Sequence, residues 1–184
     1  MINHIDVGGV LRRSVCQLYT DLVTRPTGQA VRSEIEHQLA AQPGRTLTVI
    51  DFSQVGLLDF SCADEVIAKL LLRLRDGGGE ASYVVVRGVN LVHLDAIEAV
   101  LERHRLALIV ETLDGDVLLV GELPELERRA WTVLRAQGRC AAAQLAAALG
   151  VAPDEAAAAG DALCRHGVAM ARDAAYVAIT GRPQ

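Results

Sequence analysis

The architecture of this chain follows from TLTVIDFSQVGLLDFSCADEVIAKLLLRL, the stretch from Thr46 to Leu74. Its first apolar run, Leu47 to Ile50, is short, rich in β-branched residues and preceded by Pro43-Gly44, which predicts a buried strand. After a loop, large apolar residues recur at three- and four-residue spacing and therefore share one face of a helix. These residues are Val66, Ile67, Leu70, Leu71 and Leu74. We therefore expect a strand, a turn and a helix at the centre of the fold.

The turn before this helix carries polar residues that are typical of a helix start. Ser61 is the expected N-cap, because its hydroxyl can accept hydrogen bonds from backbone N–H groups that have no partner within the helix. Asp64 and Glu65 would follow in the first turn, where the positive end of the helix dipole favours carboxylates. We expect the turn to be exposed and Asp59 to stabilise it. Cys62 is expected to be a small packed residue, the alternative being a reactive thiol with a lowered pKa.

The segment IDFSQVGLLDFSCADEVI, residues 50–67, resembles the signature of STAS domains, the fold of anti-sigma-factor antagonists. It is closer still to a STAS-like family of unassigned function, whose signature is Asp-Phe-x-x-Val, a spacer, and Phe-Ala-Asp-Glu. Cys62 stands where Phe is usual, and an upstream segment rich in Ser/Thr, Gly and Arg (24–32) also suits that family. The resemblance covers roughly residues 2–120. The matching residues are Asp51, Phe52, Val55, Ala63, Asp64 and Glu65.

The resemblance implies a STAS-like sheet with helices and a surface that binds a protein partner. In STAS antagonists a loop hydroxyl accepts phosphate and the adjacent surface docks an ATP-using, kinase-like partner. Phe60 occupies one of the two usual hydroxyl positions here, which leaves Ser61 as the candidate phospho-acceptor. The candidate partner-binding residues are Asp59, Ser61, Asp64 and Glu65.

The pattern around the central stretch predicts alternating strands and helices with short connections, which is typical of a mainly parallel sheet. An edge strand or hairpin is expected at 2–11, strands at 82–87, 106–110 and 117–120, and helices at 14–23, 29–41 and 91–103.

The connection from Thr24 to Gly28 has two interpretations. A Thr/Gly-rich helix start flanked by Arg25 and Arg32 could receive an anion or a phosphate group. The simpler interpretation is a joint between two helices that is capped by Thr27.

The pattern changes at Leu123-Pro124. Three helices (125–136, 140–149 and 153–166) precede a hairpin (170–179), and this order resembles a winged helix–turn–helix. We therefore predict two domains, a STAS-like α/β domain at 1–121 and a smaller, α-rich winged-helix domain at 122–184.

The sequence leaves open whether the second domain binds DNA or another protein. The candidate DNA-binding residues are Arg139, Arg165, Arg172 and Arg182. The third helix otherwise offers Asp154, Glu155 and Asp161 around a stripe of alanines, which is poor chemistry for reading bases. If the domain binds DNA, a homodimer is expected. If it binds protein, the Ala-rich face from Ala156 to Ala162 should pack against a partner chain.

The composition of the chain argues against several classes of function. The chain has 184 residues, 51% of them hydrophobic and 3% aromatic, and a net charge of −5, which argues against a coat for nonspecific nucleic-acid binding. Its richness in Ala, Arg, Gly and Leu suggests a bacterial genome of high GC content. No membrane span or signal peptide is predicted, so the cytoplasm is the expected location. The four scattered cysteines, which include Cys16, Cys140 and Cys164, are expected to be buried and to hold no metal.

An enzyme is the weaker hypothesis. Asp51, Asp59, Asp64 and Glu65 could converge beyond the carboxyl ends of the strands and bind Mg²⁺ or transfer protons. The sequence near them offers no histidine and no Ser–His pair. We therefore expect a non-enzymatic regulatory protein without a cofactor, most simply a transcriptional regulator, with a protein–protein interaction module as the alternative.

Overall fold

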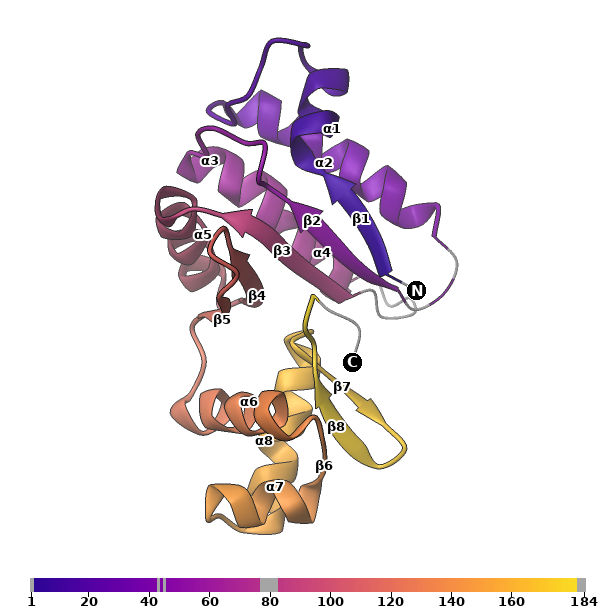
Figure 1. Cartoon of the computed structure of the whole chain (residues 1–184), viewed down its shortest axis with the longest axis vertical. Helices are drawn as coiled ribbons and strands as arrows, with labels where there is room; N and C mark the ends of the chain where they lie inside the picture. Colours follow the sequence, from indigo (N-terminus) through magenta and orange to yellow (C-terminus); the bar gives the residue numbers. More distant parts are fainter. Residues whose placement is uncertain (1, 43, 45, 77–82, 182–184) are drawn as a thin grey trace.

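The N-terminal part of the chain, up to Gly121, is built on a five-stranded sheet (Figure 1). The structure, a computed structural model, describes residues 2–42, 44, 46–76 and 83–181. The sheet order is β1-β2-β3-β4-β5, with parallel pairing from β1 to β4 and an antiparallel β5 at the edge. The strands are β1 (Ile2–Asp6), β2 (Leu47–Asp51), β3 (Tyr83–Val89), β4 (Ala107–Thr112) and β5 (Val117–Gly121). The predicted mainly parallel α/β sheet is therefore confirmed.

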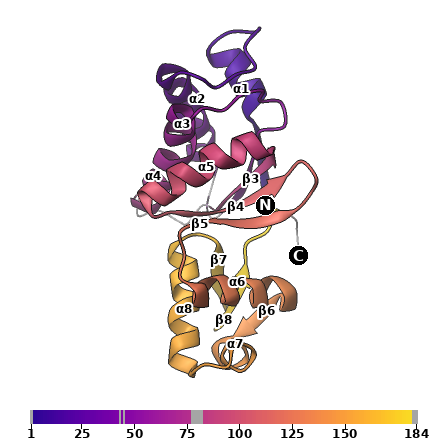
Figure 2. The ribbon, with the colours of Figure 1, turned by 90° about the vertical axis from the view of Figure 1, so that its left-hand side faces the viewer.

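All the helices that connect the parallel strands lie on one face of this sheet (Figures 1 and 2). This follows from the strand order, because right-handed crossovers that always step in the same direction place every helix on the same side. The helices are α1 (Val7–Ser14), α2 (Arg25–Ala40), α3 (Phe60–Ala63), the π-helical segment η1 (Asp64–Lys69), α4 (Leu70–Asp76) and α5 (Leu91–His104). The segments α3, η1 and α4 follow one another without a break.

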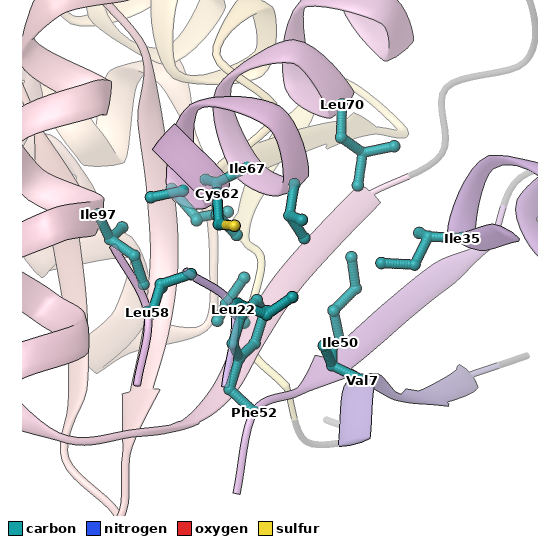
Figure 3. Packing of buried hydrophobic residues seen from close by; sticks show 14 of the residues in the cluster. Val7, Leu22, Ile35, Ile50, Phe52, Leu58, Cys62, Ile67, Leu70 and Ile97 are labelled. Carbon is teal, nitrogen blue, oxygen red and sulfur yellow. The ribbon is translucent and has the colours of Figure 1, made fainter. Parts of the chain in front are cut away.

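The core under these helices is aliphatic, as the composition requires. Ile50 and Phe52 lie at its centre and are fully buried. Figure 3 shows Cys62, Ile67 and Leu70 of the continuous helical run facing them. Strand residues alternate between the two faces, so Val84 and Val86 join this core while Val85 points to the other side.

The C-terminal part covers the opposite face of the sheet (Figure 2). It forms three helices and a three-stranded antiparallel sheet of order β6-β8-β7. A second hydrophobic cluster joins Val85, Ala107 and Ile109 of the large sheet to Trp131, Leu134 and Leu163 of the helices. The elements are α6 (Glu125–Gln137), β6 (Arg139–Ala141), α7 (Ala142–Leu149), α8 (Pro153–Arg165), β7 (Ala169–Arg172) and β8 (Ala175–Ala178).

Hydrogen bonds from arginine side chains connect the C-terminal part to the large sheet. On α6, Arg135 donates to the carbonyl of Val117 at 2.7 Å, and Arg128 donates to the carbonyls of Leu119 (3.2 Å) and Gly121. The predicted boundary between residues 121 and 122 thus marks a change of architecture, while the hydrophobic packing continues across it.

Three local predictions differ from the structure. The edge strand predicted within 2–11 is present as β1 but ends at Asp6, and α1 follows, because Gly8 and Gly9 allow its backbone to approach Gln54 and Asp6. Residues 15–24 form no helix. Their backbone pairs with the loop after β2 instead, with Leu22 N donating to Leu57 O at 2.8 Å. The helix expected to begin at Cys140 begins at Ala142, since residues 139–141 pair with β8.

Candidate functional site

The segment 24–32 and the segment 50–67 meet in space. Arg25, at the start of α2, places its guanidinium 2.7 Å from Glu65 Oε1 and 3.1 Å from Asp64 Oδ2. Both acids belong to η1, and π-helical turns of this kind are rare and are frequent at functional sites. Arginine and acids some 40 residues apart in sequence therefore form one ion-pair junction.

Glu65 is the centre of the junction and is completely buried. Its carboxylate also pairs with Lys69 one turn later and lies 3.5 Å from the Nε atom of Arg32 on α2. Burial alone would raise the pKa of Glu65, but hydrogen bonds from Lys69 and Arg25 outweigh it, so the pKa is lowered. The acid is therefore held ionised inside the protein by three cations.

Asp64 connects the junction to α5. Its Oδ1 lies 2.7 Å from Nε2 of His104, and its side chain is only 9% exposed. Burial raises the pKa of Asp64, yet the hydrogen bonds from His104 and Arg25 lower it overall. Both candidate partner-binding acids of η1 are thus buried and bound within the chain, so they do not form a contact surface in this structure.

A close backbone approach completes the junction. A Cβ atom at Gly28 would lie 3.1 Å from the Cα of Cys62 and 3.0 Å from the Cβ of Glu65, so only glycine fits without a shift. The thiol of Cys62 donates to the carbonyl of Thr24 at 2.9 Å. Burial and the nearby charge of Asp59 raise its pKa to about 11, which makes it the packed residue and not the reactive thiol.

The start of α2 is a capped joint. Thr24 is its N-cap and accepts a hydrogen bond from Thr27 N at 3.4 Å, so the expected cap at Thr27 lies three residues too far along. Arg25 and Arg32 are engaged with the acids of η1. The arginines expected to flank an anion therefore bind carboxylates of the chain itself.

The turn before α3 places Asp59 and Ser61 next to each other. Asp59, and not Ser61, is the N-cap, since its Oδ1 accepts from Cys62 N at 2.8 Å. Ser61 lies in the first turn, half-buried, and its hydroxyl donates to the Asp59 carboxylate at 2.9 Å. Phe60 between them is exposed, with the guanidinium of Arg103 5.7 Å from its ring.

A larger feature lies beside this turn, and the sequence did not predict it. The nine exposed large hydrophobic residues of the described chain all lie on the loops and helix starts beyond the carboxyl ends of the strands, and we call them the carboxyl-edge surface. Leu18 is 90% exposed and Leu91 79% exposed, which is far from their ordinary environment. The nine residues are Val15, Leu18, Tyr19, Val23, Leu57, Phe60, Leu91, Val92 and Leu113.

Backbone hydrogen bonds join the segments that carry this surface. The loop 15–24 and the loop after β2 are connected by Gly56 N to Thr20 O at 2.8 Å and by an isolated parallel bridge between Leu22 and Leu58. At the start of α5, buried His93 places Nε2 2.9 Å from the carbonyl of Gly56. The surface is therefore assembled on a hydrogen-bonded frame.

The candidate DNA-binding arginines lie in the C-terminal part, apart from the junction. Arg139 binds the β7–β8 turn, where it donates to the carbonyl of Asp173 at 3.1 Å. Arg172 is exposed on the hairpin and lies 3.7 Å from the Asp173 carboxylate, and Arg165 is exposed at the end of α8. Arg182 lies outside the described residues.

The Ala-rich face of α8 does not await a partner chain. Ala156 and Ala159 are buried in the cluster around Trp131, and Ala162 is buried as well, so the expectation that this face packs against another protein is wrong. The outward residues of α8 include Asp154, Glu155 and Asp161, which are exposed.

The carboxylates proposed for an enzyme each have a structural role. Asp51 accepts from Ser53 N at 2.8 Å, Asp59 caps α3, and the acids of η1 are ion-paired. Within the described ranges, no group of three or more His, Cys, Asp or Glu side chains is placed to hold a metal ion. Of the cysteines, Cys16 is exposed, contrary to expectation.

Across residues 2–42, 44, 46–76 and 83–181, no helix combines the length and apolar character needed to span a membrane. Comparison with known families and curated proteins adds no relative: no family model matches the chain, and no curated protein matches it either.

Proposed function

We propose that this chain is a non-enzymatic bacterial regulatory protein that receives a protein partner on its carboxyl-edge surface and passes the signal to its C-terminal part. The observation that carries the proposal is that all nine exposed large hydrophobic residues of the described chain lie on loops and helix starts at this one edge of the sheet. Contiguous apolar surface on a folded protein marks sites of interaction, whereas single scattered apolar residues do not.

The makeup of the surface supports a protein as the partner. Interface cores are enriched in aromatic and large apolar residues and depleted of charge. Here Tyr19 and Phe60 supply the aromatic rings, and Leu18 and Leu91 supply aliphatic area. The frame beneath them is hydrogen-bonded, so that docking would order few groups and would cost little conformational entropy.

Ser61 at the border of this surface supports regulation by a kinase-like ATPase. A phosphate there would lie in the first turn of a helical run, where backbone N–H groups and the dipole favour negative charge. It would also break the hydrogen bond from Ser61 to Asp59 and place two anions side by side. Phosphorylation of Ser61 is therefore proposed to loosen the turn that carries Phe60 and to release the partner.

Transcriptional regulation is the second candidate for the output, and the element order favours it. Helix, strand, two helices and two strands follow one another in the C-terminal part, the order of a winged helix–turn–helix. Its charges favour the protein alternative. Four of its six described arginines donate to backbone carbonyls of the chain, which leaves Arg165 and Arg172 for phosphate contacts.

Site-specific photo-crosslinking in a bacterial host that expresses the full chain tests the partner proposal. A benzophenone amino acid at Leu18 or Leu91 should capture the same discrete protein, and one at exposed Glu98 on α5 should not. The variant Leu57→Ser, in which an exposed residue loses its apolar side chain, should reduce the capture from Leu18. Equal capture from Leu18 and Glu98 would overturn the proposal. Mass spectrometry of the captured complex then reports whether Ser61 carries phosphate.

A gel-shift assay at low salt tests the second candidate. Duplex DNA from the upstream promoter should be shifted by the wild-type chain as a dimer, and Arg172→Ala should weaken the shift. Binding should fall steeply as salt rises, because released counterions would drive it. A shift that is absent at low salt, or that Arg172→Ala leaves unchanged, would exclude DNA binding through this hairpin and leave the protein alternative.

A further inference from the structure

A cavity of about 280 Å³ lies where the C-terminal part meets the edge of the sheet. One wall comes from the first part of the chain, with Leu71 and Arg75 of α4 and Leu106 and Leu108 at the start of β4. The other wall is the turn from α8 to β7, residues 164–168. The cavity therefore spans the junction between the two parts that the proposed function couples.

The cavity has an apolar inner side and a cationic outer side. Val84, Leu106 and Leu108 are almost fully buried, with 6%, 5% and 2% of their surface exposed. Arg75 and Arg165, which also line the cavity, are exposed to solvent. A molecule inside would thus meet hydrocarbon at one end and two guanidinium groups at the other.

Arg75 and Arg165 both line the cavity, and His166 belongs to the same lining. Burial lowers the pKa of this histidine, the charge of Glu127 raises it, and the charges of Arg165 and Arg75 lower it further. Oε2 of Glu127 lies 3.9 Å from His166 Nε2 and is buried without a hydrogen-bond partner among the described residues. Arg75 Nε also lies 3.5 Å from the carboxylate of Asp76, whereas Arg165 makes no ion pair with the described residues, so Arg165 is the arginine left free at the mouth of the cavity.

We propose that this cavity binds a small carboxylate with an apolar body and thereby couples the two parts of the chain. Arg75 and Arg165 would bind the carboxylate, and the leucine side chains would enclose the tail. Since liquid water takes up about 30 Å³ per molecule, the cavity suits a ligand of about ten non-hydrogen atoms. A medium-chain fatty acid or an aromatic acid has this size and this separation of charge from hydrocarbon.

Binding to the full chain tests the proposal, with octanoate as the probe. Octanoate at about 10 mM should raise Tm by about 2–5 °C, because a ligand that binds only the folded state stabilises it. Octanol, which has the tail without the charge, and inorganic phosphate, which has charge without the tail, should each bind at least about tenfold more weakly by calorimetry. Equal binding of octanol and octanoate would overturn the proposal.

Variants locate the site. Arg75→Gln and Arg165→Gln should each weaken octanoate binding about tenfold, which corresponds to about 1.4 kcal/mol. Arg172→Gln, a matched loss of an exposed arginine outside the cavity, should leave binding unchanged. Cys164→Met should fill part of the cavity with a flexible apolar side chain and also weaken binding. Octanoate that binds the three cavity variants, Arg75→Gln, Arg165→Gln and Cys164→Met, as it binds the wild type would place the site elsewhere and refute the assignment.

Discussion

The carboxyl-edge surface and the C-terminal part differ in how their side chains are used. At the carboxyl edge, nine large hydrophobic residues are exposed while the acids of the neighbouring η1 segment are buried in ion pairs. In the described C-terminal part, four of the six arginines donate to backbone carbonyls, and none of the exposed large hydrophobic residues lies there. The first region thus leaves apolar area available for a partner, whereas most of the arginines of the second region bind the chain itself. This difference is why we propose that the first region receives the signal, and why the target of the second region, DNA or protein, is left to experiment.

Removing the central carboxylate of the ion-pair junction should cause the largest loss of stability. Glu65→Ala leaves Arg25, Arg32 and Lys69 without their shared carboxylate, and breaking a buried ion pair in this way typically costs about 3–5 kcal/mol. Urea unfolding followed by circular dichroism measures the change. Glu98→Ala, at an exposed position on α5, is the control and should stay within about 0.5 kcal/mol of the wild type. A loss below about 1 kcal/mol for Glu65→Ala would show that the junction contributes little to stability.

Alanine substitutions at two glycines, Gly28 on α2 and Gly160 on α8, should differ in their effect on stability. In Gly28→Ala the new methyl group meets the backbone of Cys62, which cannot move without shifting α3, so we expect a loss of about 1–3 kcal/mol. In Gly160→Ala it meets the ring of Tyr176 at 2.7 Å, and moving this ring would disturb the hydrogen bond from its hydroxyl to the Asp161 carboxylate (2.8 Å). The gain in helix propensity of about 1 kcal/mol offsets part of that cost, so the net loss should be smaller than in Gly28→Ala. The opposite order in urea unfolding would contradict the packing described for α2 and α3.

The regular elements were predictable because each carries its own periodic pattern. The strand at 47–50 and the helix at 91–103 agree with β2 and α5 to within a residue. The loop 15–24 was not predictable in the same way. Val15, Leu18 and Tyr19 have helical spacing, yet the backbone is satisfied by pairing with the loop after β2, a contact between segments about 35 residues apart.

The candidate site was predictable only in part. The sequence drew attention to Arg25, Asp64 and Glu65 separately, and their pairing appears only when α2 and η1 pack together. It also placed the cap at Ser61, because Ser and Asp are equally good caps and the helix start differs by two residues. One signal for the carboxyl-edge surface was present: Leu91 and Val92 are adjacent, so they cannot both join a single helical stripe.

Acid should weaken the first region over a defined pH range. Because the folded-state pKa values of Asp64 and Glu65 are lowered, the unfolded chain binds more protons in acid, and stability rises with pH. The contribution is present above the ordinary carboxyl values of about 4 and is lost as pH falls through the lowered ones. Urea unfolding between pH 3 and 7 should show this slope, and Glu65→Gln should flatten it. A slope that survives in the double variant Asp64→Asn/Glu65→Gln would have to come from other acids.

In the C-terminal part, stability should begin to fall at a higher pH than in the ion-pair junction, and by a smaller amount. The pKa of His166 is lowered in the folded state, chiefly by burial, so between its lowered value and the ordinary value of about 6.5 the unfolded chain binds the extra proton. Stability therefore falls as pH drops below about 6.5, before the carboxylates begin to titrate. Trp131, the one tryptophan of the chain, is buried in the cluster beneath α8, so its fluorescence reports on this region. His166→Gln should remove the early pH dependence of the fluorescence midpoint and leave the acid limb near pH 4 in place, whereas an unchanged early slope would assign it to another group.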